Sequence, residues 1–112
     1  MSSARGLGPW PVRRAVVRGS SMAPTLVDGD VVLVVRRRPR PGDVVLVRWA
    51  ARPGQLSVKR AARRDGDGWD VRGDLPSAST DSRALGPARV LGTVPVRLWP
   101  APRRLRREPG RP

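Results

Sequence analysis

The sequence predicts an all-β fold: one small domain of short strands that form a coiled sheet or a partly open barrel. Residues 30–35 (DVVLVV) and 43–49 (DVVLVRW) are β-branched runs that suit buried strands and are too short for helices. Gly, Pro and Asp-Gly breaks separate such runs at short intervals, and no segment shows helical periodicity. A chain of 112 residues, 38% of them hydrophobic, suits one domain with a modest core.

Strands are expected in the following order along the chain: residues 12–18, 30–35, 43–49, 55–62, 68–72 and 90–98. An Asp-Gly-rich hairpin turn joins the fourth and fifth strands, and a polar loop at residues 73–87 precedes the last. Pro95 lacks a backbone N–H, so the last strand is expected at an edge of the sheet.

The two ends of the chain differ in composition from the middle. Residues 1–11 are rich in Gly, Pro and Ser and predict a flexible N-terminal segment. Residues 100–112 are rich in Pro and Arg and predict a disordered basic tail. The folded domain is therefore expected to span residues 12–99.

Missing residue types exclude several kinds of site. The chain has no cysteine and no histidine, which excludes disulfides, thiolate nucleophiles, Ser-His-Asp triads and His-ligated metals. A general base would have to be a carboxylate, a lysine or a cofactor. We expect no metal and no cofactor.

A formal net charge of +14 is compatible with nucleic acid, an anionic membrane or an acidic protein as partner. No DNA-binding motif is present, and aromatic residues are too few for a stacking platform, so we expect no specific nucleic-acid binding. No run of about 18 apolar residues occurs, and residues 1–18 lack the apolar stretch of a secretory signal. We therefore expect no transmembrane segment and a cytoplasmic protein.

Lys59 is the single lysine among 23 basic residues. Arginine does not lose its proton in proteins, whereas a buried lysine can. Position 59 is therefore a candidate for a base that must be neutral. Strand alternation places Ser57, Lys59 and Ala61 on one face, where small neighbours leave room for the lysine side chain.

Several segments together resemble the S26 family of signal-peptidase-like serine peptidases. They are residues 19–26 (GSSMAPTL), 29–30 (GD), 42–45 (GDVV), 58–60 (VKR), 73–74 (GD), 79–83 (STDSR) and 86–87 (GP). The chain is most similar to a branch of that family, the maturation peptidases of nickel-type superoxide dismutase. The resemblance implies a signal-peptidase/LexA-like catalytic core over residues 12–99. It also implies a protein precursor as partner, from which an N-terminal propeptide is removed.

The resemblance assigns Ser21 as nucleophile and Lys59 as general base. A serine hydroxyl is a weak nucleophile until a base takes its proton, and a lysine can do this when burial lowers its pKa. The N–H of Ser21 is a candidate oxyanion donor, while Gly19 stands where one branch has a hydroxyl residue. Ser20 is adjacent to the nucleophile and is a second candidate in a supporting role.

The loop before the last strand supplies the expected support for the dyad. The resemblance implies that Asp81, Ser82 and Arg83 hold it in place. Asp81 and Arg83 are close enough in sequence to pair, and Ser79 is a candidate to orient the lysine by a hydrogen bond.

The substrate is expected to bind as an extended strand between residues 14–19 and 55–58. Apolar side chains near the dyad predict a shallow pocket that favours small side chains before the cleaved bond. The expected pocket residues are Val16, Met22, Leu26 and Val58.

Three alternatives are open: a signal peptidase I-like enzyme for exported proteins, a self-cleaving repressor-type peptidase, and a non-catalytic basic β-domain that binds nucleic acid or an acidic protein. Labelling of Ser21 by a serine-directed probe, dependent on Lys59, would distinguish an enzyme from a binding domain. The oligomeric state is open.

Overall fold

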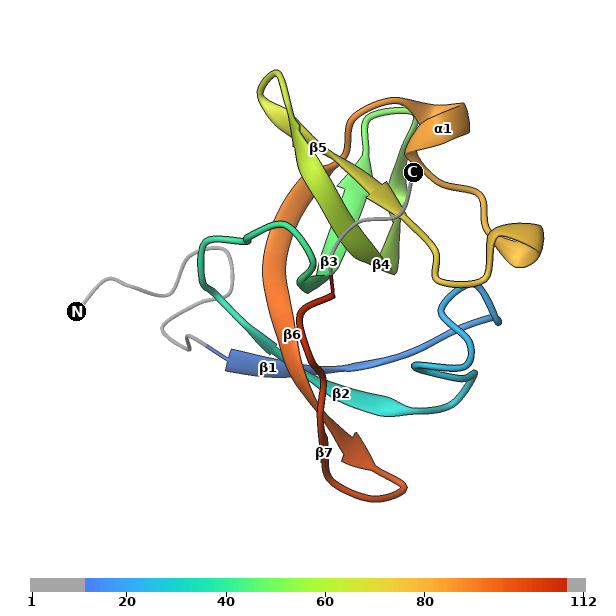
Figure 1. Ribbon diagram of the computed structural model, residues 1–112, viewed down its shortest axis with the longest axis vertical. Helices are drawn as coiled ribbons and strands as arrows, with labels where there is room; N and C mark the ends of the chain where they lie inside the picture. Colours follow the sequence, from blue (N-terminus) through green and yellow to red (C-terminus); the bar gives the residue numbers. More distant parts are fainter. Residues whose placement is uncertain (1–11, 109–112) are drawn as a thin grey trace.

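One antiparallel sheet contains every strand of the computed structural model, which describes residues 12–108 (Figure 1). The strands are β1 (Val12–Val16), β2 (Val31–Val35), β3 (Val44–Trp49), β4 (Arg52–Asp65), β5 (Gly68–Arg72), β6 (Arg89–Trp99) and β7 (Arg103–Arg104). Their order across the sheet is β1-β2-β6-β3-β4-β5, with β7 also paired to β6. Two short helical segments, η1 (Pro76–Ala78) and α1 (Ser82–Leu85), lie in the loop between β5 and β6.

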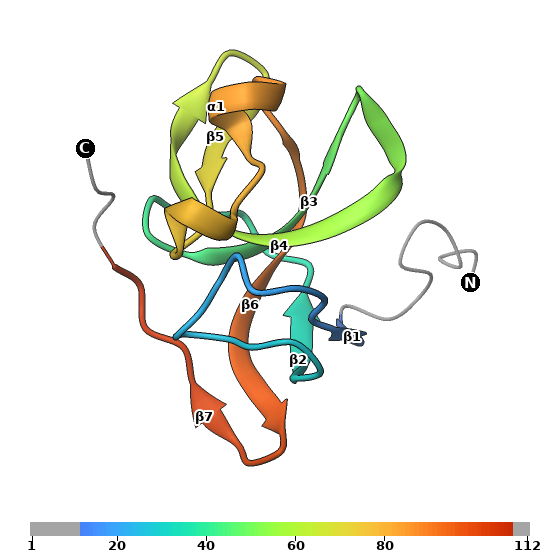
Figure 2. The same cartoon turned by 90° about the vertical axis from the view of Figure 1, so that its right-hand side faces the viewer.

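The length of β6 explains how one sheet folds over on itself. Its first half pairs with β3 and its second half pairs with β2 and β7, so it joins two groups of strands. Figures 1 and 2 show β6 as a long bent strand that runs through both groups. The sheet does not close, since in the described chain β1 pairs only with β2. The predicted all-β, partly open coiled sheet is confirmed.

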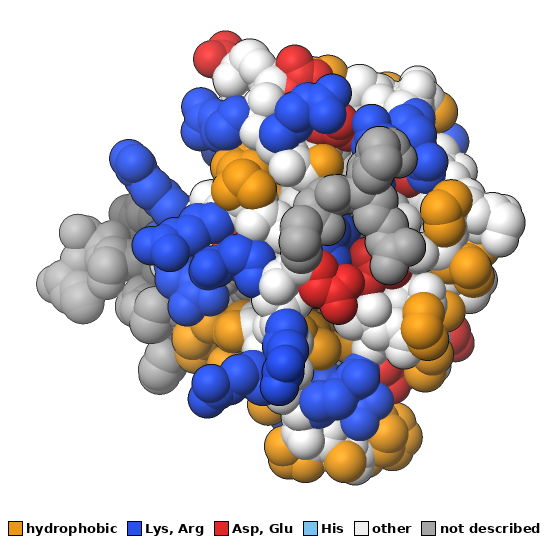
Figure 3. Space-filling model, viewed as in Figure 1, with side chains coloured by type: hydrophobic (Ala, Val, Ile, Leu, Met, Phe, Trp, Pro, Cys, Tyr) orange, Lys and Arg blue, Asp and Glu red, His pale blue; other side chains and the backbone are white. Residues whose placement is uncertain are grey.

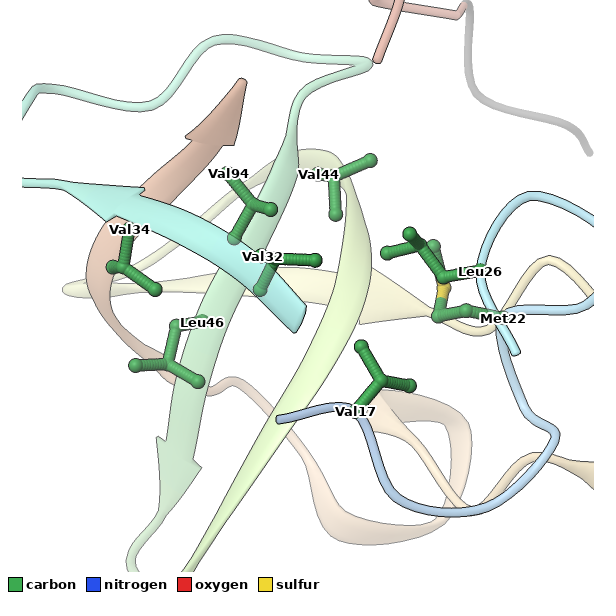
Figure 4. Close-up of a cluster of buried hydrophobic side chains, with 8 residues drawn as sticks. All are labelled: Val17, Met22, Leu26, Val32, Val34, Val44, Leu46 and Val94. Atoms are coloured by element: carbon green, nitrogen blue, oxygen red, sulfur yellow. The ribbon is translucent and has the colours of Figure 1, made fainter. Parts of the chain in front are cut away.

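Two hydrophobic clusters form the core, one on each side of β3. Val44 and Leu46 point into the first cluster, whereas Val45, Val47 and Trp49 point into the second. Successive side chains of a strand point to opposite faces, so a strand buried on both faces reads as an unbroken apolar run. Figure 4 shows the first cluster, between β2, β3, β6 and the segment that follows β1.

Pro95 does not mark a sheet edge, and this prediction is wrong. It lies inside β6, which has strands on both sides. On one side of β6 the pairing with β3 ends at Thr93 and the pairing with β7 covers Val96 and Arg97, so Pro95 lies between the two partners, where a missing N–H is tolerated. The carbonyl of Pro95 accepts a hydrogen bond from the N–H of Leu105.

Residues 100–108 also differ from the disordered tail that was expected. Leu105 packs against the first cluster, Arg107 Nε donates to Asp43 at 2.8 Å, and the N–H of Glu108 donates to the carbonyl of Gly42 at 3.0 Å. The Pro/Arg composition does not predict these contacts, because they depend on one leucine, one arginine and backbone hydrogen bonds that only the folded sheet supplies. Residues 109–112 and the expected flexible segment 1–11 lie outside the described residues. Neither helical segment within residues 12–108 is long and apolar enough to cross a membrane.

Candidate active site

Ser21 begins a turn that follows the first strand of the sheet. The N–H of Gly19, which has a φ of 80°, donates to Asp28 at 2.8 Å and bends the chain just before Ser21. On the other side, the carbonyl of Ser21 accepts a hydrogen bond of 2.8 Å from the N–H of Leu75. The Ser21 backbone is therefore held between its own turn and the loop after β5.

Lys59 reaches Ser21 from β4, where it lies opposite Val45 of β3. Only 5% of Lys59 is exposed. Its Nζ lies 2.9 Å from Ser21 Oγ and 3.3 Å from Ser79 Oγ. Residues 38 positions apart in sequence thus form a hydroxyl–amine pair at a site with no histidine.

Burial lowers the pKa of Lys59 below its usual value, because the charged ammonium loses water. The carboxylate of Asp81 acts in the opposite direction and raises the pKa, while the nearby Arg83 lowers it. Desolvation is the largest of the three effects, so the neutral form of Lys59 is populated at lower pH than that of an exposed lysine. A neutral amine can accept the proton of Ser21.

Ser79 and Asp81 fix the direction of the hydrogen bonds around Lys59. Ser79 Oγ donates its single hydrogen to Asp81 Oδ2 at 2.7 Å. Ser79 Oγ can then only accept from Lys59, and it also accepts from the N–H of Gly73 at 3.2 Å. One N–H of Lys59 is thereby directed to Ser79, and Nζ also donates to Ser21 Oγ, so the amine is held between the two hydroxyls.

Asp81 is 2% exposed and stays ionised. Burial alone would raise its pKa, but hydrogen bonds from the Arg83 guanidinium, from Ser79 and from the N–H groups of Gly73 and Arg83 outweigh burial and hold the pKa well below its usual value. The Arg83 bonds are 3.0 and 2.8 Å long. Arg83 makes no hydrogen bond to Lys59: its bonds keep Asp81 ionised, and its charge also lowers the pKa of Lys59 through space.

Gly73 allows the loop to pack against the dyad. A Cβ at this position would lie 2.6 Å from both the carbonyl oxygen of Ser21 and the Cβ of Ser79, closer than packed atoms approach. Any side chain at position 73 would therefore push Ser21 away from Ser79 and Lys59.

Ser20 and Ser82 lie outside this hydrogen-bond chain. Ser20 has an exposed side chain beside the nucleophile. Ser82 Oγ accepts from the N–H of Val71 at 3.0 Å and donates to the carbonyl of Trp69, so it ties the start of α1 to β5. Its position is that of a support for the loop rather than a partner of Lys59.

A groove of about 690 Å³ leads to the dyad between the β1 side and the first half of β4. It is lined by residues of both segments between which the extended substrate was expected, including Val16 and Val58. Leu46, Leu56 and Ala78 add further apolar surface to its lining.

Met22 and Leu26 were predicted as pocket residues, and the structure contradicts this. They are 1% and 0% exposed and belong to the first hydrophobic cluster (Figure 4). The turn after Ser21 winds inward, with the N–H of Leu26 bonded to the carbonyl of Met22 at 2.9 Å. Both side chains therefore point into the core beneath the dyad and anchor Ser21 from below.

An ion pair that the site prediction missed lies behind the dyad. Arg60 is 6% exposed and contacts both carboxylate oxygens of Asp74 at 3.2 and 2.6 Å. Asp74 also accepts from Thr25 Oγ1 at 2.6 Å, so the pair links β4, the loop after β5 and the turn after Ser21. The sequence signal that could have predicted this ion pair is the presence of Arg60 and Asp74 in two of the family-like segments, Lys59-Arg60 and Gly73-Asp74. No group of three or more metal-ligating side chains gathers anywhere in residues 12–108.

Comparison with known proteins gives one family match. The family described as signal peptidase, peptidase S26, matches residues 10–75, which is more than half of the chain. The matched part includes Ser21, Lys59 and the Arg60–Asp74 pair and ends before Ser79. A search of curated proteins finds no match.

Proposed function

The chain belongs to the peptidase S26 family of signal peptidases, and from this premise we propose that it is a serine endopeptidase with Ser21 as nucleophile and Lys59 as general base. The observation that carries the proposal is the 2.9 Å separation of Lys59 Nζ and Ser21 Oγ. Burial supports it, because a lysine with a lowered pKa can be neutral when it meets the hydroxyl.

In the proposed reaction, Lys59 Nζ takes the proton of Ser21 as Oγ attacks the carbonyl carbon of the scissile bond. The tetrahedral intermediate collapses when the Lys59 ammonium gives that proton to the leaving nitrogen. The released fragment carries the new amine, and the other fragment stays bound to Ser21 as an ester. Lys59 then takes a proton from water, whose oxygen attacks the ester carbon. The bond from that carbon to Ser21 Oγ breaks as Lys59 returns the proton to Oγ, which releases a carboxylic acid and restores Ser21 and neutral Lys59.

The oxyanion of the intermediate needs hydrogen-bond donors. The N–H of Ser21 is the proposed donor. The N–H of Gly19 is already used by Asp28, and Gly19 has no side-chain hydroxyl to offer. Ser20, beside the nucleophile at the groove, is the remaining hydroxyl close in sequence.

The proposed substrate is the N-terminal propeptide of a protein precursor, and the resemblance of residues 79–83 to one branch of the family points to nickel superoxide dismutase. The groove supports an extended substrate, because residues of two strand segments line it together with Ser21 and Lys59. We expect substrates with small side chains before the cleaved bond. These side chains would contact Val16 and Val58, whereas Met22 and Leu26 are buried in the core.

The dyad is tested by substitution. Ser21→Ala should abolish peptide cleavage and labelling by a serine-directed probe. Lys59→Arg should lower kcat/KM by roughly 10²–10⁴-fold, because an arginine cannot act as a base. Ser77→Ala, an exposed serine of η1, is the matched control and should behave as the parent. Substantial activity in Lys59→Arg, with the fold intact by circular dichroism, would contradict the dyad.

The precursor is tested separately, by incubating nickel superoxide dismutase precursor with the protein and reading the new N-terminus by mass spectrometry. Cleavage at the propeptide junction that requires Ser21 supports the substrate. A probe-reactive protein that leaves the precursor intact keeps the dyad and rejects this substrate.

A further inference from the structure

Arginine side chains dominate the polar lining of the groove. Arg13, Arg14, Arg18 and Arg52 line it together with Lys59, whereas no Asp or Glu does. All four arginines are exposed. The groove that leads to the dyad therefore carries four positive charges next to a modest apolar surface.

None of these four arginines has a carboxylate partner within residues 12–108. The arginines that form ion pairs there are Arg60, Arg63, Arg72, Arg83, Arg97 and Arg107. All nine acidic side chains of the sequence fall inside the described range, at Asp28, Asp30, Asp43, Asp65, Asp67, Asp70, Asp74, Asp81 and Glu108. The positive charge of the groove is thus left for a ligand to neutralise.

The strand edges that face the groove favour an extended peptide as that ligand. In the described chain β1 pairs only with β2, and residues 52–59 of β4 pair only with β3. Each strand therefore leaves one edge whose backbone N–H and C=O groups can bind an added strand. The apolar side chains of Val16, Leu56 and Val58 between the arginines suit a peptide better than a nucleic-acid backbone.

We propose that the protein selects substrates with Asp or Glu residues on one side of the cleaved bond, at a distance set by the groove arginines. This specificity rests on the proposed peptidase function. The positive charges attract the acidic segment, the strand edges bind its backbone, and the dyad cuts where the groove ends.

The spacing of the arginines sets where the acidic residues lie. Arg18 precedes Ser21 by three residues, and Arg52 precedes Lys59 by seven residues along β4. A strand rises about 3.3 Å per residue, so seven residues span roughly 23 Å. An extended substrate alongside β4 should therefore meet Arg52 about seven residues from the scissile bond and Arg18, just before the bend that precedes Ser21, closer to that bond, on the side that occupies the groove.

Peptides with one cleavage site provide the test, with Asp pairs three to seven residues before the cut, after the cut, or replaced by Asn. An exposed ion pair gives roughly a 1.5- to 5-fold gain. We therefore expect kcat/KM to rise about tenfold for acidic residues on one side, chiefly through KM. The gain should shrink from 50 to 500 mM NaCl. Equal rates for the Asp and Asn peptides overturn the proposal.

The groove is tested by replacing Arg13, Arg14, Arg18 and Arg52 together with Gln. This variant should lose the acidic preference and still cut the Asn peptide. The matched control, Arg36, Arg38, Arg40 and Arg89 to Gln, removes the same charge from exposed positions outside the groove lining and should keep the preference. A control variant that loses the preference equally shows general charge attraction and overturns the proposal.

Binding to the Ser21→Ala variant separates this proposal from the peptidase function. Acidic peptide should bind it more tightly than the Asn peptide, and single-stranded oligonucleotide of equal charge should bind more weakly than the acidic peptide. Stronger oligonucleotide binding overturns the proposal in favour of a nucleic-acid groove. A parent protein that cuts no peptide and resists the serine probe rejects the peptidase function, whereas cleavage without acidic preference rejects only the specificity.

Discussion

At the scale of single residues, the ionisation of Lys59 depends on the two charges that lie beyond Ser79. Asp81 raises the pKa of Lys59 and Arg83 lowers it, while burial outweighs both in lowering it. Because the neutral amine is the proposed base, activity should be absent at low pH and rise with pH through the pKa of Lys59. The acidic limb of the pH–rate profile therefore reports this environment.

Asp81→Asn should move the acidic limb of the kcat/KM profile to lower pH, because it removes the charge that stabilises the Lys59 ammonium. Arg83→Gln is the paired variant and should move the limb to higher pH, since it removes a repelling charge. Profiles of both variants, measured on one peptide, check the signs. Displacement of both limbs in the same direction would contradict this account of the site.

At the scale of elements, β7 and the residues after it act as a brace for the strand that carries Lys59. Arg60 Nη1 donates to the carbonyls of Gly42 and Arg106 at 3.0 and 2.9 Å, so the chain after β7 supplies an acceptor to a buried guanidinium next to Lys59. Leu105 covers part of the first cluster at the same time. This segment therefore contributes to the stability of the sheet and to the position of β4.

A chain that ends at Pro100 should be less stable by about 2–5 kcal/mol, from lost apolar burial and an Arg60 left without one of its acceptors. Urea unfolding measures the loss. A chain that ends at Glu108 retains these contacts and is the matched control. Equal unfolding midpoints for the chain ending at Pro100 and the full chain would show that residues 101–108 contribute nothing.

At the scale of the whole molecule, the charge excess is spread widely. Lys and Arg side chains occur over much of the face in Figure 3, while acidic side chains gather in fewer places. With 23 basic and nine acidic side chains, repulsion between surface arginines opposes folding. The buried pairs, such as Arg60 with Asp74, are screened much less by salt than the exposed charges are.

Raising NaCl from 10 to 300 mM should therefore raise Tm by a few degrees, equivalent to roughly 0.5–1 kcal/mol. Differential scanning calorimetry without added ligand checks this. The variant with Gln at positions 36, 38, 40 and 89 carries four fewer charges and should show a smaller salt effect. A Tm that falls with salt would mean that attractive ion pairs outweigh the repulsion.

Local sequence determined the strands and the candidate residues of this protein. Apolar runs between Gly-rich turns predicted six of the strands, because burial and turn geometry are local properties. Ser21 and Lys59 stood out by motif and by the rarity of lysine, and the fold brings them to hydrogen-bonding distance, although their catalytic role stays a proposal.

Tertiary structure alone decided which face of each segment meets the core. Met22 and Leu26 belong to the turn after Ser21, and that turn winds inward and buries both side chains. Residues 103–105 lack the composition of a strand and pair only because β6 offers them an edge. The arginines of the groove come from β1 and β4, and only the coiling of an unclosed sheet brings these distant segments to one opening. Such contacts depend on long-range packing, which local propensity does not encode.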